Sequence, residues 1–448
     1  MDGSALGSES IRQFDYGAVF LMAVTIMVFL VPIFTIFPPV PVEPGDALRQ
    51  THYKLGRPSH QSNLDHHHTS DQQPQTGTKP TVKSLFIYPI KSCRGIELDR
   101  SRVLPTGLEH DRLFMFAQRK PTAAHSGTHA GPRYSWEAVT QRQLPLLANI
   151  NVDVWLPDAS KTSRQLGHLD DKFLLVRFPW QAPGWRGNMH LLATKLSRGW
   201  RAVPEKQFLL PMDFPSQTEM EARSYEFEHV KIWTDVSRAL NMSKDLPPQL
   251  ATYLGAKHQL ALFRSDPSSR RKVFGCAPRK ETLGYQPEVD FHDGYPIHLL
   301  NMSSIHALES LIQKDESIQS LNARRFRGNI IVSGAEEYDE DEWKSVRFRS
   351  SSRPGESSQF DVSCRTVRCK LPNVDPATGV RHGVEPDRSL RKYRVVDEGA
   401  PRMGCLGMQL CPVFPDASTP ARLESYVQVG MGVEVLERGP HKYLKEST

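Results

Sequence analysis

The residues with the clearest chemical potential lie between Cys364 and Gly379, in the sequence CRTVRCKLPNVDPATG. This segment holds two cysteines among basic side chains, and positive neighbours stabilise a thiolate, the form of cysteine that binds a soft metal. It ends in a tight-turn sequence, in which Asp375 can accept hydrogen bonds from backbone N–H groups ahead of it and Gly379 permits a positive φ. A buried structural cysteine at a strand end is the alternative interpretation. The segment therefore predicts a thiol held by a rigid turn and leaves its role open.

Short strands must position this turn, because the chain shows alternating apolar residues in short runs and few helical patterns. We predict strands over residues 84–89, 112–117, 150–155, 226–233, 326–334 and 430–436. One helix is predicted to open at Pro247-Pro248 and stop at Gly255, and another follows a cap at Asn301 or Ser303. The predicted fold class is mainly β (α+β), with two β-rich units of the barrel or sandwich type.

The segment from Ala18 to Phe37 is almost wholly apolar, and twenty such residues in a helix span about 30 Å, the thickness of the hydrocarbon core. We predict a single transmembrane anchor over residues 18–37 after a tail of residues 1–17, with a cleaved signal peptide as the rival interpretation. Flanking charges place the main body in the cytosol. Residues 38–80 are polar and lack an apolar period, which predicts a flexible linker.

The charge and the cysteine content of the sequence argue against several classes of protein. The formal charge of +6 comes from scattered basic residues, which suits a small anionic ligand or an acidic partner protein rather than nucleic acid. Six cysteines in 448 residues are too few for a disulfide scaffold. A zinc site built from Cys364, Cys369, Cys405 and Cys411 would lack the paired Cys-x₂-Cys spacing typical of such sites.

Four motifs occur in an order that resembles one family. They are YPIKSCRG at 88–95, GLEHDR at 107–112, FRGN at 326–329, and RC followed by VDPATG at 368–379. Together they resemble the proteins that join an N-terminal MOSC β-barrel domain to a MOSC domain, and among these the mitochondrial amidoxime-reducing components, which also carry an N-terminal membrane helix. The resemblance implies a first domain over residues 81–264 with an insertion at about 156–225. A basic insertion at 265–290 and a MOSC domain at 291–440 follow.

The resemblance also implies a molybdenum cofactor, a phosphorylated pyranopterin that carries molybdenum. The cysteine of the last motif corresponds to Cys369, as metal ligand and catalytic residue. The residues that correspond to cofactor contacts are Lys91, Ser92, Arg112, Arg327 and Asn329. Asp293 is implied beside the pterin, with an ordinary turn aspartate as the alternative. These residue types suit the task, because a phosphate favours a lysine, a forked arginine and a hydroxyl, and an asparagine offers a donor and an acceptor to a pterin edge.

The function implied by the resemblance is the reduction of N-hydroxylated compounds of the amidoxime type. The sequence lacks a Gly-x-Gly-x-x-Gly dinucleotide fingerprint, so electrons are expected from another protein. The resemblance implies cytochrome b5 and its NADH-dependent reductase, on the outer mitochondrial membrane, with the endoplasmic reticulum as the alternative from hydropathy alone.

Two other functions stay open. One is a molybdenum-cofactor carrier or sulfur-transfer module without reductase activity, since MOSC domains also end the cofactor sulfurases. Those proteins carry a large pyridoxal-phosphate-dependent lyase domain, for which we expect no room in this sequence. The other is a membrane protein with β-domains and no catalytic activity.

Overall fold

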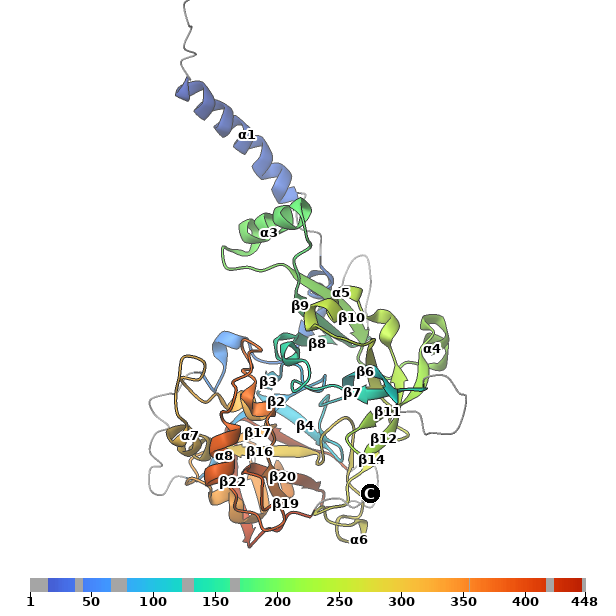
Figure 1. Ribbon diagram of the computed structural model, residues 1–448, viewed down its shortest axis with the longest axis vertical. Helices are drawn as coiled ribbons and strands as arrows, with labels where there is room; N and C mark the ends of the chain where they lie inside the picture. The colour runs from blue at the N-terminus through green and yellow to red at the C-terminus, as the bar shows by residue number, and fades with distance from the viewer. Residues whose placement is uncertain are drawn as a thin grey trace, which may run out of the picture. The chain divides into compact units, whose positions relative to one another are not determined.

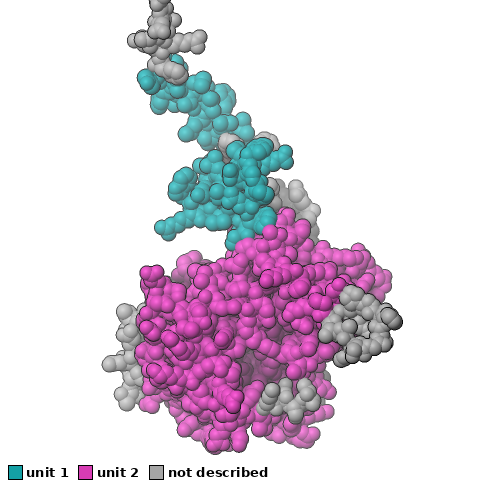
Figure 2. All heavy atoms as spheres, viewed as in Figure 1, with its two compact units in different colours: residues 1–43, 179–205 teal, residues 44–178, 206–448 magenta. Residues whose placement is uncertain are grey.

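The computed structural model describes residues 15–36, 43–65, 79–122, 133–161, 170–353, 355–415 and 423–444. The chain divides into two compact units (Figure 2). The first contains residues 1–43 and 179–205, and the second contains residues 44–178 and 206–448.

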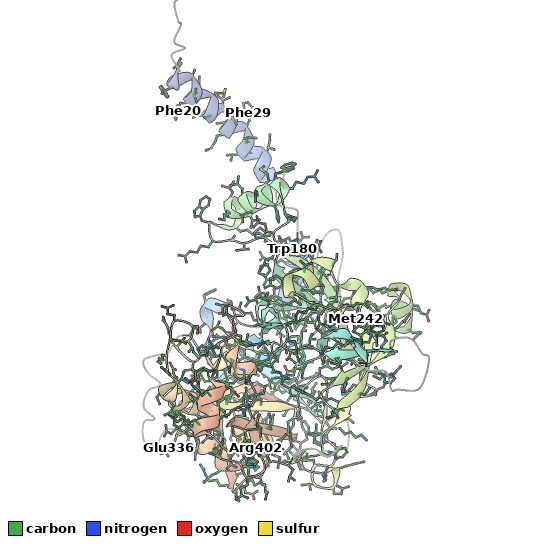
Figure 3. All side chains as sticks on the ribbon, viewed as in Figure 1. Phe20, Phe29, Trp180, Met242, Glu336 and Arg402 are labelled. Atoms are coloured by element: carbon green, nitrogen blue, oxygen red, sulfur yellow. The ribbon has the colours of Figure 1, made fainter. Side chains whose placement is uncertain are left out.

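The first unit holds two helices, α1 (Tyr16–Ile36) and α3 (Trp185–Arg198) (Figure 1). The segment Tyr16–Ile33 of α1 has a mean hydropathy of 2.4, and none of it is buried. Phe20 and Phe29 project outward from this helix (Figure 3). Among the described residues, α1 is the one helix that is long and apolar enough to cross a membrane, a test that a signal sequence also passes. Its bounds agree closely with the apolar segment predicted at 18–37.

The second unit is mainly β, as predicted, and its first large element is a closed barrel (Figure 1). The barrel strands, in spatial order, are β11 (Glu226–Ile232), β12 (Asp235–Asn241), β13 (Leu260–Ser265), β6 (Phe114–Thr122) and β7 (Arg133–Ala138). Parallel pairing of β11 with β7 closes the ring, and the other pairs are antiparallel. Alternate side chains point inward and form an apolar core around Met115, Trp136, Val230 and Phe263.

An eight-stranded sheet forms the other large element. Its spatial order is β17 (Ile330–Ser333), β16 (Ile297–Asn301), β20 (Cys405–Val413), β19 (Ser357–Val367), β18 (Trp343–Arg349), β22 (Gly432–Arg438), β2 (Thr81–Ile87) and β3 (Ile96–Leu98). An additional pairing of β17 with β2 joins the ends of this sheet and leaves β3 outside the ring. β2 comes from the predicted first domain, whereas its neighbours β17 and β22 come from the predicted MOSC domain. The predicted insertion at 265–290 therefore does not separate two independent sheets.

The predicted flexible linker at 38–80 is wrong for residues 43–65. These residues form α2 (Pro44–Leu48), β1 (His52–Lys54) and the short 3₁₀ helix Ser59–Gln61. The segment is held in place because Glu97, a buried carboxylate, accepts hydrogen bonds from Ser62 Oγ at 2.5 Å and Asn63 N at 3.0 Å. The carboxylate would be costly to bury without these donors, a tertiary requirement that local composition does not reveal. Residues 66–78 lie outside the described part of the chain.

The predicted insertion at 156–225 also differs from the structure. It contains β9 (Phe173–Pro179) and β10 (Glu205–Pro211), which join β1 and β8 (Asn151–Pro157) in a four-stranded sheet in the order β1-β8-β9-β10. Leu174 and Val176 on β9 are buried together with Val152 and Val154 on β8, so the segment packs as part of this sheet. The irregular composition around its tryptophans belongs to α3 and its flanks.

The remaining elements connect these sheets. A three-stranded sheet joins β21 (Ser425–Gln428), β4 (Arg100–Leu104) and β5 (Gly107–Leu108), and a short ladder joins β14 (Arg271–Lys272) to β15 (Glu288–Val289) within the predicted basic insertion. The other helices are α4 (Gln217–Arg223), α5 (Pro248–Leu254), α6 (Lys280–Leu283), α7 (Met302–Leu311) and α8 (Asp387–Tyr393). The predicted start and stop of α5 and the predicted start of α7 are confirmed. Gly255 ends α5 with a φ of 64°, and Asn301 Oδ1 accepts from Ser303 N at 3.2 Å at the start of α7.

Candidate functional site

One cavity of about 130 Å³ in the second unit is lined by all seven residues predicted to bind the cofactor or the metal. Lys91 and Ser92 follow β2, Arg112 precedes β6, and Asp293 precedes β16. Arg327 and Asn329 lie just before β17, and Cys369 follows β19. The residues come from five places in a chain of 448, so it is the pairing of β2 with β17 that brings the early and late motifs to one cavity.

Lys91 and Asp293 form an ion pair at this cavity. Lys91 Nζ lies 2.7 Å from Asp293 Oδ1 and donates a second hydrogen bond of 2.7 Å to Phe291 O. Burial lowers the pKa of Lys91 to about 8, although the Asp293 carboxylate acts in the opposite direction. Trp233 Nε1 donates to the same carboxylate oxygen at 3.1 Å. The partial removal of Asp293 from water favours a higher pKa, but the Lys91 ammonium and these hydrogen bonds lower the pKa overall. The pair therefore presents one buried cation beside one ionised carboxylate.

Asn329 holds Arg112 in the cavity wall. Its Oδ1 accepts from Arg112 Nη1 at 3.2 Å and from His298 N at 3.1 Å. Its Nδ2 donates to Phe86 O at 3.1 Å and to Asp111 Oδ2 at 2.9 Å. Both donors and both acceptor positions of this fully buried amide are thus used by the protein. In this geometry Asn329 orients Arg112, and its contact with a pterin stays a prediction.

Asp111 is the charged partner of Arg112. The two side chains form an ion pair, and His292 Nε2 lies 3.1 Å from Asp111 Oδ2. Burial raises the pKa of Asp111, but Arg112 and His292 lower it to about 2, so the carboxylate is ionised. Asp111 also accepts from Tyr88 N at 2.6 Å, which ties the first motif to the second.

Arg327 forms another wall of the cavity. Its Nη1 donates to Cys93 O at 2.7 Å, and its guanidinium lies 4.1 Å from the ring centroid of Tyr88. Within the described part of the chain, its Nη2 is buried without a hydrogen-bond partner. Burial lowers the pKa of this guanidinium, but an arginine stays charged at neutral pH. Arg327 therefore offers one unused cationic donor.

The backbone is strained at three of these residues. Ser92, Arg112 and Arg327 have φ values of 69°, 52° and 56°, in the left-handed region that L-residues other than asparagine and glycine seldom adopt. Each such residue costs about 1–2 kcal/mol and persists only where its surroundings determine it. Among the described residues, three of the seven with a positive φ that are not glycine line this cavity, where the conformation sets the direction of their side chains.

Cys369 precedes the turn that the sequence predicted. Asp375 Oδ1 accepts from Ala377 N and Thr378 N, each at 2.9 Å, and Gly379 has a φ of 69°, which confirms the predicted turn chemistry. Asp375 Oδ2 also accepts from Arg325 Nη2 at 2.6 Å. Arg325 itself is buried.

Sequence reasoning did not single out several further lining residues, among them His298, Thr366 and Arg368. Burial lowers the pKa of His298 far below its usual range, assisted by Arg368 and Arg112, so its imidazole is neutral. Arg368 Nη2 donates to Phe326 O at 3.0 Å, which fixes the residue that precedes Cys369. The position of Arg368 inside the Arg-Cys motif was the available signal. For His298 and Thr366, only the sheet pairing reveals their location.

These residues fit a large anionic group. The lining carries the positive side chains Lys91, Arg112, Arg327 and Arg368 against one carboxylate, Asp293. Within the described residues, Arg327 Nη2, Arg368 Nε, Thr366 Oγ1 and His292 Nδ1 are buried without hydrogen-bond partners. Buried polar atoms are nearly always paired, so this concentration is typical of a site whose partner is a ligand. A phosphorylated cofactor matches both the charge and the unused donors.

Cys369 is the cysteine among the described lining residues, and the other cysteines are not part of this lining. Cys364 and Cys411 are buried in an apolar cluster with Val273, Tyr285 and Tyr295, which agrees with a structural role for Cys364. In the described ranges, no group of three or more histidine, cysteine, aspartate or glutamate side chains is placed to hold a metal ion. Nothing in this geometry therefore supports the alternative of a four-cysteine zinc site.

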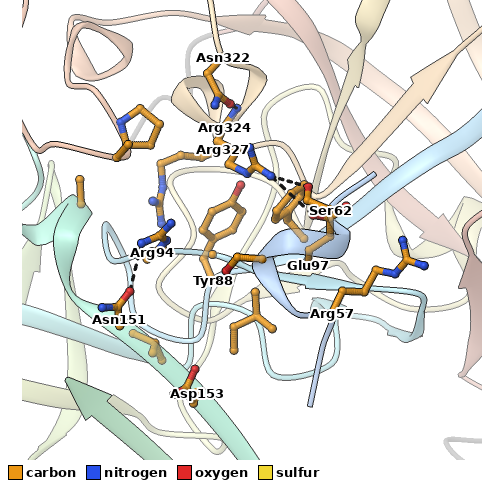
Figure 4. Close-up of a pocket in the computed structure, with 18 of the residues that line it drawn as sticks. Arg57, Ser62, Tyr88, Arg94, Glu97, Asn151, Asp153, Asn322, Arg324 and Arg327 are labelled. Atoms are coloured by element: carbon orange, nitrogen blue, oxygen red, sulfur yellow. Dashed lines mark hydrogen bonds and ion pairs between the residues drawn. The ribbon is translucent and has the colours of Figure 1, made fainter. Parts of the chain in front are cut away.

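Figure 4 shows a second cavity of about 370 Å³, which shares Arg327 with the first. Its charged walls are largely paired with one another. Arg324 Nη1 lies 2.9 Å from Asp65 Oδ1, and Arg94 Nη1 donates to Asn151 Oδ1 at 3.2 Å. Residues from the segment predicted as a linker form part of this cavity, so that segment contributes to the surroundings of the candidate site.

Comparison with known proteins agrees with the motif order. The family model for the MOSC N-terminal beta barrel domain matches residues 79–179, and that for the MOSC domain matches residues 286–434. Mitochondrial amidoxime reducing component 2 of Rattus norvegicus is 23% identical over 329 residues, which cover 71% of this chain and 73% of that protein. Mitochondrial amidoxime-reducing component 1 of Mus musculus is 23% identical over 326 residues, covering 71% and 72%.

The molybdenum cofactor sulfurase of Arabidopsis thaliana is also 23% identical, over 325 residues that cover 70% of this chain and 31% of that protein. The shared region supports a function connected with the molybdenum cofactor. With both domains matched in the expected order, the chain belongs to the MOSC-domain family, as a MOSC N-terminal β-barrel domain followed by a MOSC domain, and resembles the mitochondrial amidoxime-reducing components.

Proposed function

We propose that this protein is a membrane-anchored molybdenum-cofactor oxidoreductase that reduces N-hydroxylated compounds of the amidoxime type. The proposal rests on the observation that Cys369 lines the same cavity as Lys91, Arg112 and Arg327. A thiol, three cations and several unused buried donors suit a phosphorylated cofactor with a soft metal. The names of the relatives from Rattus norvegicus and Mus musculus support the choice of substrate class.

Each residue then has a distinct task. Lys91, Arg112 and Arg327 would hold the anionic phosphate and pterin, with Ser92 supplying a hydroxyl, and Cys369 would ligate the metal. When bound, the molybdenum–pyranopterin would supply the two-electron redox chemistry that reduction of an N–O bond requires. Asn329 and Asp111 keep Arg112 in position, and Asp293 keeps the Lys91 ammonium at the wall. The turn from Asp375 to Gly379 would limit the motion of the ligand cysteine.

Electrons would come from a partner protein. The sequence has no dinucleotide fingerprint, and its net charge of +6 suits association with an acidic cytochrome. The family resemblance makes cytochrome b5 and its NADH-dependent reductase the partners to test. Helix α1 would hold the protein in the outer mitochondrial membrane with its main body in the cytosol, and the endoplasmic reticulum is the second membrane to examine. A shared membrane surface would raise the effective concentration of all three proteins.

The direct test is turnover by the full chain in detergent or vesicles. Purified protein is analysed for molybdenum and pterin, and is then supplied with reduced cytochrome b5 and benzamidoxime. We expect one pterin and one molybdenum per chain and formation of the amidine. Cys369→Ser should lower turnover by about two orders of magnitude or more and leave the pterin content largely unchanged.

Cys276→Ser is the matched control, since Cys276 is a partly exposed thiol outside the cavity lining. It should keep wild-type turnover. Metal-replete protein without turnover, or an active Cys369→Ser variant, would overturn the reductase proposal.

A carrier or sulfur-transfer module is the second candidate, and the similarity to the Arabidopsis thaliana sulfurase favours it. Such a protein would contain the same cofactor and the same cavity. Its expected behaviour is transfer of the pterin, or of sulfur, to an acceptor protein without amidine formation. The turnover assay therefore separates the two candidates, whereas the metal content does not.

A further inference from the structure

Helix α3 carries an apolar stripe that is exposed to solvent. Trp185, Met189, Leu192 and Leu196 have exposed fractions of 72%, 59%, 47% and 73%. Their spacing of four, three and four residues places them on one side of the helix, since each residue advances by about 100°. Large apolar side chains that are exposed in a continuous row are typical of an interaction surface.

The opposite side of α3 holds the buried residues of this helix. Gly187 and Thr194 are its buried residues, and both lie about 180° from the centre of the stripe. A Cβ at Gly187 would come within 1.7 Å of Ala182 O, so the close packing of this face requires glycine. The stripe is therefore directed away from the packed face.

The charged residues of α3 and its flanks are positive, although one of them, Arg198, is paired with Glu43. Residues 180–204 contain the four basic side chains Arg186, Lys195, Arg198 and Arg201 and no aspartate or glutamate. Tryptophans stand at both ends, where Arg186 lies over the Trp185 ring at 5.6 Å and Lys195 Nζ over the Trp200 ring at 5.6 Å. Tryptophan beside lysine or arginine, with an apolar face between, is the composition of a helix that lies in a membrane interface.

The chain also ties α3 to the segment that follows α1. Arg198 Nη1 lies 3.0 Å from Glu43 Oε2, within the same compact unit. Glu43 follows the end of α1 at Ile36 by seven positions, which an extended chain spans in about 25 Å at most. If α1 crosses a membrane, the last turn of α3 cannot be far from its surface.

We propose that α3 lies in the headgroup region of the membrane that holds α1, with its apolar stripe at the acyl-chain boundary and its cations on anionic lipid headgroups. The charge of residues 180–204 favours a lipid surface over a second copy of this basic chain. The inference rests on the anchoring part of the proposed function and is independent of the reductase chemistry.

Tryptophan fluorescence tests the proposal in the full chain. The apolar helix α1 contains no tryptophan, whereas Trp185 and Trp200 are exposed by 72% and 75%. The chain is reconstituted into vesicles of phosphatidylcholine and phosphatidylserine whose acyl chains are either brominated or unmodified. We expect bromine to quench part of the fluorescence, and the double variant Trp185→Phe/Trp200→Phe to lose the quenched component. Replacing phosphatidylserine with phosphatidylcholine should reduce the quenching.

A matched pair of charge variants locates the contact. Leu196→Glu places a carboxylate on the stripe and should abolish most of the quenching. Ser197→Glu places the same charge on the neighbouring exposed residue, about 100° around the helix, and should retain it. Both variants should keep the reductase activity of the wild type, because neither residue lines the cavity.

Flotation of the vesicles separates the two proposals. A chain that floats with the vesicles but shows no quenching overturns the role of α3 and leaves the anchor intact. A chain that does not float overturns both. Equal quenching in the two charge variants, or a dimer in detergent that Leu196→Glu alone dissociates, would also overturn the membrane contact.

Discussion

Lys91 and Asp293 are paired at 2.7 Å although 202 residues separate them along the chain. The Lys91 side chain is 5% exposed and that of Asp293 is 64% exposed, so the carboxylate faces solvent while the ammonium is enclosed. Because Phe291 O is also a partner of this ammonium, its position is fixed by the segment that leads into β16. The cation of the first motif therefore depends on a residue near the start of the second domain.

The charge of Lys91 predicts a pH dependence of anion binding. Burial lowers the pKa of Lys91 to about 8, from 10.5 for the ordinary side chain. Below about pH 8 the buried ammonium is protonated, which lowers the stability of the folded chain. This loss of stability decreases as the pH rises from 8 towards 10.5. Stability from this group rises over that window, whereas affinity for an anion falls.

Binding of inorganic phosphate to cofactor-free protein, followed by calorimetry between pH 7 and 10, checks this expectation. Lys91→Arg should remove the loss of affinity near pH 8, since an arginine keeps its charge. Lys91→Met should bind phosphate weakly at every pH. A wild-type affinity that is constant across the range would contradict the assigned charge state.

Asn329→Ala should destabilise the fold. The variant removes one hydrogen bond each from Arg112, Asp111, the backbone N–H of His298 and the backbone carbonyl of Phe86 at a fully buried position, which costs about 2–4 kcal/mol. The free energy of unfolding in urea measures the loss. Asn188→Ala, at an exposed position on α3, is the control and should change it by less than about 0.5 kcal/mol. Equal effects of the two variants would refute the orienting role of Asn329.

Arg325 and Asp375 should show energetic coupling. Asp375→Ala leaves the buried Arg325 guanidinium without its charged partner, and such a loss costs about 3–5 kcal/mol for a fully buried pair. Since Asp375 is 26% exposed, we expect a smaller loss, about 2 kcal/mol. In the double variant Arg325→Met/Asp375→Ala the loss should be less than the sum of the single losses. Additive losses in urea denaturation would show that the pair does not support the turn after Cys369.

Ser92 allows a test of backbone strain at the cavity. Its φ of 69° favours glycine, so Ser92→Gly should be more stable than Ser92→Ala by about 1 kcal/mol. Both variants lack the hydroxyl, and both should therefore retain less pterin than the wild type. Thermal unfolding gives the first comparison and pterin fluorescence the second. An alanine variant as stable as the glycine variant would mean that the strain is not present in solution.

Part of the fold could be predicted from residue types at short spacing. The apolar run of α1, the caps of α5 and α7, and the turn at Asp375 follow from residue types at short spacing, which act before any tertiary contact forms. The phase of the Arg-Cys motif likewise distinguished Cys369 from Cys364, and the structure places the first at the cavity and the second in an apolar core.

Other features were decided only by the tertiary structure. Residues 43–65 are held in place by hydrogen bonds that Ser62 and Asn63 donate to the buried carboxylate of Glu97. The composition of this segment does not indicate these bonds. The orienting role of Asn329 could not be predicted for a similar reason, since four partners from distant segments use its amide completely. Sequence by itself thus determined which residues could bind a cofactor. The long-range pairing of β2 with β17 decided which of them face the cavity and which support it, because burial and hydrogen bonding depend on neighbours that are remote in the chain.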